Sequence, residues 1–408
     1  MRVVTSLSVL ATLCLLAPSM GCSTCAYGDF SPAECRVAAE HTVAQTVVDG
    51  VTLRFQDPAA STADRWDALG VFWVEDGAVH ARPSTLVDFA ISVDPGDSGL
   101  TELAVVLHNV GADAALVAGP PGAEAPLDSV ADGLRRDVVV PLGGAPVFVR
   151  GSRPCGSEFR LAVAGDVQTN PDQLEQVLLE MGTEATSAAA AGQPLMGFVL
   201  LGDLAEDPVE DELTHVLSVL ERSPVPVSVV PGNHDVHGDE LALYNRIFGA
   251  GTYAQGVCSA RLALMDTGTG DLAASVQARI PSLFARPDYD FLVVGGHYPA
   301  WPGRTGNGWG DEDAAWYMLT EMVRNEADMY ISGHYHSWEE MPRIAVGPGE
   351  VHQIISGTAG GDQGAGAPRY GFTRLTFTGA GMQSCFVDVQ PLEAASGPSG
   401  VDIIRVCP

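Results

Sequence analysis

The sequence predicts an α/β fold, in which helices pack on a layered sheet, preceded by a small β-rich, sandwich-like domain. From about residue 158 onward, apolar strands alternate with segments of helical spacing, and this alternation is typical of α/β sheets. Before about residue 150, short apolar runs are separated by clusters of Gly, Pro and Asp, which is typical of β-sandwiches. With 46% hydrophobic residues in 408, the chain can build the cores of two or three domains.

The chain begins with a pattern typical of a secretory signal. Arg2 supplies a positive charge, and the apolar run over residues 3–16 is shorter than the roughly 20 residues of a membrane-spanning helix. We therefore predict a signal peptide over residues 1–21. The small residues before Cys22 resemble a bacterial lipoprotein cleavage site, although Ser19 stands where Leu is usual. Cys22 is then predicted to carry lipid, and the alternative is ordinary cleavage nearby.

This pattern predicts a secreted, periplasmic or cell-surface lipoprotein of a bacterium, which contacts a membrane only through the lipid anchor. The cysteines agree with an oxidising compartment. They are Cys14, Cys22, Cys25, Cys35, Cys155, Cys258, Cys385 and Cys407. Cys14 leaves with the signal peptide, and Cys22 is expected to carry lipid. The six cysteines that remain are an even number, which suits disulfides, and their connectivity stays open. A C-terminal extension over 383–408 is predicted to be tied by such a bond.

The charge balance is strongly acidic. The 51 Asp and Glu residues outnumber 21 basic residues, all of them Arg, and the formal net charge is −30. Binding to nucleic acid rests on many contacts between basic side chains and phosphates, so we expect no nucleic-acid partner. Docking on an anionic membrane by charge alone is disfavoured for the same reason. A small phosphate-bearing substrate is still compatible with this charge, because a bound metal can supply positive charge locally.

The β-rich domain is predicted over residues 26–150. Its clearest strands are expected at 51–55, 71–74 and 103–107. His41, His80 and His108 are scattered along this region, and each is interpreted as a surface or a satisfied structural histidine. Residues 151–156 have the composition of a linker.

The second domain is predicted over residues 158–382. Its strands are expected at 159–164, 196–201, 225–230, 291–294 and 329–331, and its first two helices at 172–182 and 209–222. Pro171 marks the start of the first helix and Gly182 its end.

Each of these five strands is followed by Gly and then by Asp, Asn or His. The carboxyl ends of strands in α/β sheets line the functional crevice, so these polar side chains are expected to meet there. The candidates are Asp166, Gln168, Asp203, Asn233, His234, His297, His334 and His336. Carboxylate, amide oxygen and imidazole ligands suit Mn, Fe or Zn. Two such ions about 3.5–4 Å apart can clamp a phosphoryl group and activate water.

The motifs are similar to those of a known family. The blocks are Gly165-Asp166-Val167-Gln168, Gly202-Asp203, Gly232-Asn233-His234-Asp235, Gly296-His297 and Gly333-His334-Tyr335-His336. In this order they resemble the five signature blocks of the calcineurin-like metallophosphoesterase superfamily, over about residues 158–380. The resemblance implies a two-sheet α/β/β/α sandwich core that holds two divalent or trivalent metal ions, with Mn, Fe or Zn expected.

The resemblance also implies a role for each residue. Asp203 is expected to bridge both metals. The other ligands are Asp166, Gln168 and His336 on the first metal, and Asn233, His297 and His334 on the second. His334 and His336 are two apart on an extended segment, so both can face the metals.

Three residues are expected to be catalytic, Asp203, Asn233 and His234. His234 is expected to face the substrate, where it stabilises the transition state or protonates the leaving oxygen. An acid usually orients this histidine in the family, and here either Glu206 or Asp207 is a candidate. Arg304, in the loop after His297, is a candidate contact for substrate phosphate, and the alternative is an ordinary exposed loop.

One residue departs from the family pattern. Gln168 stands where the family usually has His, and a neutral amide oxygen is a weaker metal ligand than imidazole. The preferred hypothesis is a hydrolase of small phosphate mono- or diesters that acts outside the cytoplasm. The alternative is a surface-anchored binding protein with a degenerate, weakly active or inactive phosphoesterase domain. A nuclease is disfavoured by the charge of −30.

Overall fold

The computed structural model describes residues 32–58, 68–236, 242–300, 309–363, 369–389 and 407. The predicted signal peptide and Cys22 lie outside these residues. Within the described part of the chain, no helix combines the length and the apolar character that a membrane span requires.

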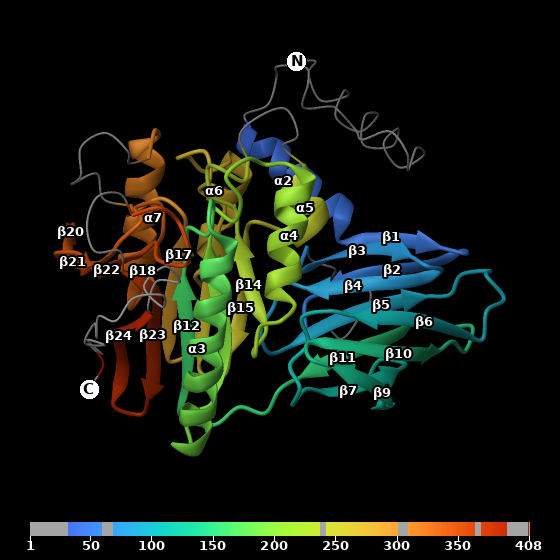
Figure 1. Ribbon diagram of the computed structural model, residues 1–408. Helices are drawn as coiled ribbons and strands as arrows, with labels where there is room; N and C mark the ends of the chain where they lie inside the picture. The colour runs from blue at the N-terminus through green and yellow to red at the C-terminus, as the bar shows by residue number, and fades with distance from the viewer. Residues whose placement is uncertain are drawn as a thin grey trace, which may run out of the picture.

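The N-terminal part contains one helix, α2 (Pro32–Val43), and two β-sheets among its described residues (Figure 1). The first sheet has the order β1 (Gln45–Val48), β2 (Val51–Gln56), β5 (Phe89–Asp94), β11 (Val147–Ser152), β7 (Ala115–Gly119) and β8 (Ala125–Pro126). The second has the order β3 (Gly70–Glu75), β4 (Ala78–Pro83), β6 (Glu102–Leu107), β10 (Arg135–Pro141) and β9 (Ser129–Asp132). Apolar side chains of both sheets pack in one core, as in a β-sandwich.

The C-terminal part contains two main sheets that face each other. One has the order β14 (Val227–Val230), β13 (Leu195–Leu201), β12 (Phe159–Ala164), β23 (Tyr370–Thr378) and β24 (Gly381–Val389). The other has the order β15 (Tyr253–Val257), β16 (Ala260–Met265), β17 (Phe291–Gly296), β18 (Met329–Ser332), β22 (Gln353–Ser356) and β19 (Trp338–Glu340). A small hairpin pairs β20 (Ile344–Val346) with β21 (Gly349–Val351).

Helices cover the outer faces of both sheets (Figure 1). On the first sheet lie α3 (Pro171–Ala190), α4 (Glu210–Leu220) and α5 (Leu243–Phe248), and on the second lie α6 (Ala274–Leu283) and α7 (Glu312–Arg324). The central strands are buried on both faces, which explains why β13 is apolar at every position. The predicted α/β/β/α sandwich after a β-rich region is therefore confirmed.

One helix differs from its predicted length. Helix α3 starts as expected, with Pro171 in its first turn and Asn170 accepting the amide hydrogen of Gln173 at 3.2 Å. Its predicted end at Gly182 is wrong, because the helix continues to Ala190. A glycine inside a helix costs only about 1 kcal/mol, and the buried side chains beyond it continue the apolar face.

The β-sandwich and the α/β/β/α sandwich pack against each other. Asn109 donates to the carbonyl oxygens of Pro83 and Val227, both at 2.9 Å, and accepts the amide hydrogen of Val227 at 2.7 Å. It therefore occupies the edge of β14 as a neighbouring strand would. His80 and His108 meet here too, with ring nitrogens 3.0 Å apart, so both are satisfied structural histidines as interpreted.

Disulfides join segments that are distant in the sequence. Cys155 pairs with Cys258, so the segment interpreted as a linker is covalently tied to the sheet that contains β15 and β16. Cys385 of β24 pairs with Cys407, and the predicted boundary at residue 382 falls inside β24. Cys35 is also disulfide-bonded.

Helix α2 is anchored in the second sandwich by buried polar contacts. Arg36 donates two hydrogen bonds to the carboxylate of Asp266, at 2.5 and 3.0 Å. Glu40 accepts the amide hydrogens of Gly251 at 2.8 Å and Thr252 at 3.0 Å. Burial, together with the nearby charge of Asp266, raises the pKa of Glu40 to about 8.

We expect Glu40→Gln to stabilise the protein increasingly as the pH rises. Because the folded-state pKa of Glu40 is raised above its ordinary 4.5, its contribution to stability is present below about pH 4.5 and is lost as the pH rises through about 8. A Gln oxygen can accept the same two amide hydrogens without this loss. In urea unfolding, the free energy of unfolding of the variant should exceed that of the wild type by a difference that rises to roughly 4–5 kcal/mol above pH 8. Parallel pH curves for both proteins would contradict this account.

Candidate metal centre

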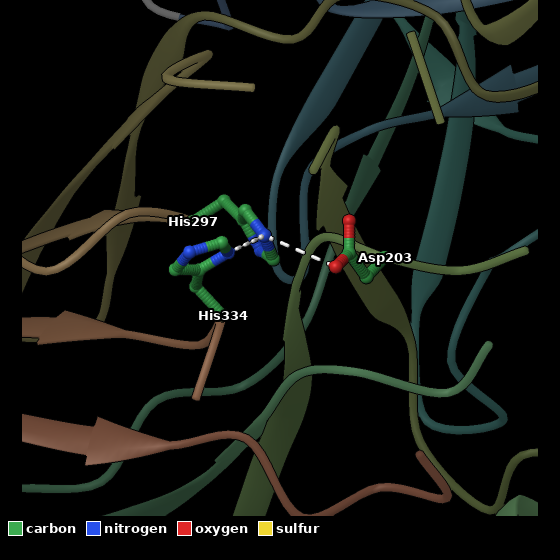
Figure 2. Close-up of side chains that lie close together, drawn as sticks. All are labelled: Asp203, His297 and His334. Atoms are coloured by element: carbon green, nitrogen blue, oxygen red, sulfur yellow. Dashed lines mark hydrogen bonds and ion pairs between the residues drawn. The ribbon is translucent and has the colours of Figure 1, made fainter. Parts of the chain in front are cut away.

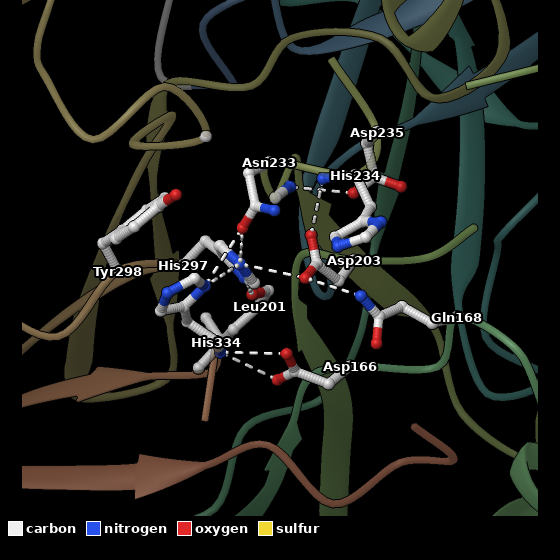
Figure 3. A network of polar contacts seen from close by, with 12 residues as sticks. Asp166, Gln168, Leu201, Asp203, Asn233, His234, Asp235, His297, Tyr298 and His334 are labelled. Atoms are coloured by element: carbon white, nitrogen blue, oxygen red, sulfur yellow. Dashed lines mark hydrogen bonds and ion pairs between the residues drawn. The ribbon is translucent and has the colours of Figure 1, made fainter. Parts of the chain in front are cut away.

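The predicted site residues that Figure 3 labels come together at the carboxyl ends of five strands. Asp166, Asp203 and Asn233 follow β12, β13 and β14 of one sheet. His297 and His334 follow β17 and β18 of the other. The two sheets therefore supply ligands to one site from opposite sides, as the repeated pattern of glycine and polar residue predicted.

Four residues of this site have the left-handed backbone conformation, which residues other than glycine rarely adopt. Asp166, Gln168, Asp203 and His334 have positive φ angles of 63°, 35°, 51° and 72°. Such strain is maintained only where the surrounding structure enforces it, and it is common at functional sites. Gly202, with φ of 88°, has to be glycine because an added Cβ would lie 2.7 Å from Nδ1 of His297.

Four potential ligand atoms converge on one side of the site. The Nε2 atom of His297 lies 3.0 Å from Oδ1 of Asn233 and 3.2 Å from Oδ2 of Asp203. The Nδ1 atom of His334 lies 3.0 Å from the same Asn233 oxygen and 3.3 Å from Nε2 of His297. Figure 2 shows the histidines beside Asp203. These are the residues expected to hold the second metal.

The other side of the site is formed around Asp166. Carboxylate oxygens of Asp166 and Asp203 and a ring nitrogen of His336 lie within 4.8 Å of one another. The Nε2 atom of His336 is 3.6 Å from Asp166, and its Nδ1 atom donates to the carbonyl oxygen of Asp362 at 2.5 Å. Gln168 is buried here and donates from Nε2 to Oδ2 of Asp203 at 3.1 Å. Asp203 thus belongs to both groups, as expected for a bridging ligand.

The electrostatics of the site favour a cation. Burial raises the pKa of Asp166 to about 7. Burial alone would raise the pKa of Asp203, but the charge and hydrogen bond of His297 outweigh it and lower that pKa. Burial would lower the pKa of His297, yet the charge of Asp203 raises it to about 9. Burial and the positive charge of His297 lower the pKa of His334 to about 3.

These values fit the metal ligands predicted from the sequence. His297 donates from Nδ1 to the carbonyl oxygen of Leu201 at 2.7 Å, so its Nε2 atom faces Asn233 and Asp203. In neutral His297 this nitrogen would present a lone pair to two oxygen lone pairs, and a proton on Nε2 relieves the repulsion. A divalent cation can take the place of that proton, because carboxylate, amide oxygen and imidazole are its usual ligands.

His234 lies beside the candidate metal ligands and is oriented by Glu206. Its Nδ1 atom donates to the backbone carbonyl oxygen of Glu206 at 2.7 Å and lies 3.8 Å from the Glu206 carboxylate. Its backbone amide donates to Oδ1 of Asp203 at 2.9 Å. Of the two acids considered from the sequence, Glu206 therefore contacts the ring, and it does so mainly through its backbone.

Sequence reasoning assigned no role to three residues that support the site. Asp235 is buried and accepts the amide hydrogens of Leu204, Ala205 and Gly232 at 2.8–3.1 Å. Thr267 accepts the amide hydrogens of His297 at 2.8 Å and Tyr298 at 3.1 Å, and Tyr298 stacks on His334. Asp235 ends one of the motif blocks, so a signal existed. Thr267 and Tyr298 are in contacts that no motif marks.

Arg304 lies outside the described residues, so its predicted contact with substrate phosphate stays a prediction. The roles of the other candidates as metal ligands or catalytic groups also stay predictions, now with a defined geometry.

Comparison with known proteins relates this geometry to a family. Residues 159–338 match the family model described as calcineurin-like phosphoesterase, and this segment contains all five motif blocks. None of the curated proteins matches the chain.

The chain is also similar to solved structures at low sequence identity. A purple acid phosphatase from yellow lupin (Lupinus luteus) seeds is 12% identical, with a TM-score of 0.50 over 75% of this chain and 70% of that one. PhoD is 11% identical, with a TM-score of 0.44 over 72% and 82% of the two chains. GAP50, the anchor in the inner membrane complex of Plasmodium, is 17% identical, with a TM-score of 0.43 over 57% and 85%. The likeness to the lupin structure shows a shared fold.

Proposed function

We propose that this chain, whose residues 159–338 match the calcineurin-like phosphoesterase family model, hydrolyses small phosphate mono- or diesters outside the cytoplasm. The family and the site together support a metal-dependent phosphoesterase. The observation that carries the proposal is the convergence of two groups of ligand atoms that share Asp203, namely Asp203 with His297 and His334, and Asp203 with Asp166 and His336.

Each group would hold one ion. Asp166, Gln168 and His336 would bind the first, Asn233, His297 and His334 the second, and Asp203 both. When bound, the two ions supply Lewis-acid activation of water and of the phosphoryl oxygens. The identity of the metals is proposed as Mn, Fe or Zn from the mixture of oxygen and nitrogen ligands.

His234 is proposed to complete the reaction by moving a proton. Water attacks the phosphorus, the bond from phosphorus to the ester oxygen breaks, and the electron pair stays on that oxygen. His234, protonated on both ring nitrogens, gives its Nε2 proton to the leaving oxygen and takes up another from solvent after turnover, and the attacking water releases a proton to solvent. Because Nδ1 is bound to the Glu206 carbonyl, Nε2 is the ring nitrogen assigned to this transfer.

The location outside the cytoplasm is supported by the disulfides Cys155–Cys258 and Cys385–Cys407, which persist in oxidising compartments. The signal-peptide pattern at residues 1–21 supports it independently. The net charge of −30 supports a small substrate over a polyanion such as nucleic acid.

The proposal is tested with the purified chain reconstituted with Mn, Fe or Zn. We expect hydrolysis of p-nitrophenyl phosphate, of bis-p-nitrophenyl phosphate or of both. We also expect a chelator to abolish the activity and His234→Ala to lower kcat by roughly 100-fold or more. A metal-loaded protein that hydrolyses neither compound, nor a wider panel of phosphate esters, contradicts the proposal.

Gln168 supports a second candidate, a surface-anchored binding protein with a degenerate phosphoesterase domain. Its amide nitrogen is hydrogen-bonded to the oxygen of Asp203 that faces His297, so the side chain must turn before its own oxygen can bind a metal. The same reconstitution separates the two functions. A chain that binds no transition metal after reconstitution supports the binding protein, and a chain with close to two equivalents supports the enzyme.

A further inference from the structure

The loop between β13 and α4 is held by two carboxylates. The amide hydrogens of Leu204 and Ala205 bind Asp235 at 2.8 and 3.1 Å. Those of the next two residues, Glu206 and Asp207, bind a single oxygen of Glu212 at 3.0 and 3.1 Å. Four successive amide groups of this loop therefore have carboxylate partners. Such a loop has little freedom to rotate its peptide planes, because hydrogen bonds to charged groups are stronger than neutral ones.

One of these peptide groups also contacts His234. The peptide bond between Glu206 and Asp207 presents its N–H to the carboxylate of Glu212 and its carbonyl oxygen to Nδ1 of His234. The carboxylate polarises this peptide group, and a polarised carbonyl oxygen is a better acceptor for the histidine N–H. A negative charge is thus relayed to the ring through a backbone amide. The carboxylate of Glu206 adds a longer contact to the same nitrogen, at 3.8 Å.

We propose that Glu212 is a positioning residue for His234 and acts through the peptide bond between Glu206 and Asp207. This inference rests on the proposed function. Glu212 does not touch the substrate. It holds the carbonyl oxygen that keeps the proton on Nδ1 and aligns the ring, so that Nε2 delivers its proton to the leaving oxygen. Glu212 belongs to none of the motif blocks. It lies in the first turn of α4, next to Glu210 and Asp211.

The dependence on Glu212 should vary with the leaving group of the substrate. A good leaving group such as p-nitrophenolate departs as a stable anion and needs little help from a proton donor. An alkoxide is a poor leaving group and has to be protonated as the bond to phosphorus breaks. Glu212 is therefore needed for esters of aliphatic alcohols.

The test compares Glu212→Ala and Glu212→Gln on two substrates, p-nitrophenyl phosphate and an alkyl phosphate, with zinc bound. We expect Glu212→Ala to lower kcat on the alkyl ester by about 10-fold or more and on the aryl ester by less than about 3-fold. Glu212→Gln keeps an oxygen that accepts both amide hydrogens but loses the negative charge, so its kcat on the alkyl ester should lie between those of wild type and Glu212→Ala. Asp211→Ala removes an exposed carboxylate from the same turn and is the matched control.

Equal losses on both esters, or none on either, would overturn the inference.

A second readout does not depend on turnover. In the zinc-loaded protein, the ¹⁵N resonances of the His234 ring report the protonation and hydrogen bonding of each ring nitrogen. We expect protonated Nδ1 in wild type and Glu212→Gln, and a changed signal in Glu212→Ala. An unchanged His234 spectrum in Glu212→Ala overturns the positioning role, whereas a wild-type chain inert to both esters contradicts only the proposed function.

Discussion

Asp203→Asn is expected to abolish most phosphoesterase activity and to empty the metal centre. Asp203 contributes to both groups of ligand atoms, and one of its oxygens lies 3.2 Å from His297. The variant replaces one carboxylate oxygen by an NH₂ group that has no lone pair for a metal. We expect kcat to fall by more than about 100-fold, the upper end of the loss when only an outer-shell partner of a ligand is removed.

Activity and metal content per chain are to be measured on the same preparation. Asp211→Asn, an exposed residue of α4, is the control for the change of charge. A variant that retains two equivalents of metal and wild-type kcat would show that Asp203 is not a bridging ligand.

Asp235→Ala is expected to destabilise the fold by about 3 kcal/mol or more, because each buried donor without a partner costs about 1–3 kcal/mol. The change leaves three buried amide groups without an acceptor, those of Leu204, Ala205 and Gly232. Leu204 and Ala205 begin the loop whose Glu206 carbonyl oxygen binds His234, and Gly232 directly precedes Asn233. We therefore also expect weaker metal binding.

Asp235→Asn is the matched variant for this prediction. Its oxygen can accept the amide hydrogens of Leu204 and Ala205, while its NH₂ group meets the N–H of Gly232. Its loss of stability in urea unfolding should therefore be smaller than that of Asp235→Ala. Equal stability of wild type and both variants would show that Asp235 does not brace the two loops.

That the candidate site residues lie together was predictable because their signal is local. In each block a glycine and a polar residue follow an apolar strand directly, so Asp203 or His297 can be found from neighbours in the chain. The α/β class was predictable for a similar reason, because strands such as β13 are apolar throughout, and the resemblance to the family added the two-sheet α/β/β/α arrangement. What the blocks left open was how each side chain is held in place.

The remaining features depend on contacts between distant segments, which a single sequence does not reveal. His80 and His108 meet only because their strands belong to the same sheet. The end of α3 was misplaced because Gly182 looks like a stop signal, whereas burial of the following turns extends the helix. Glu212 belongs to no motif block, and its two backbone partners became visible only in the structure.

The central claim is that two metal ions share Asp203 at the carboxyl ends of the strands. Crystals of the metal-loaded protein, measured with X-rays at the absorption edge of the added metal, test it most directly. We predict two anomalous peaks about 3.5–4 Å apart on opposite sides of the Asp203 carboxylate. One peak should lie among Asn233, His297 and His334, and the other among Asp166, Gln168 and His336. A single peak, or none at Asp203, would contradict the account.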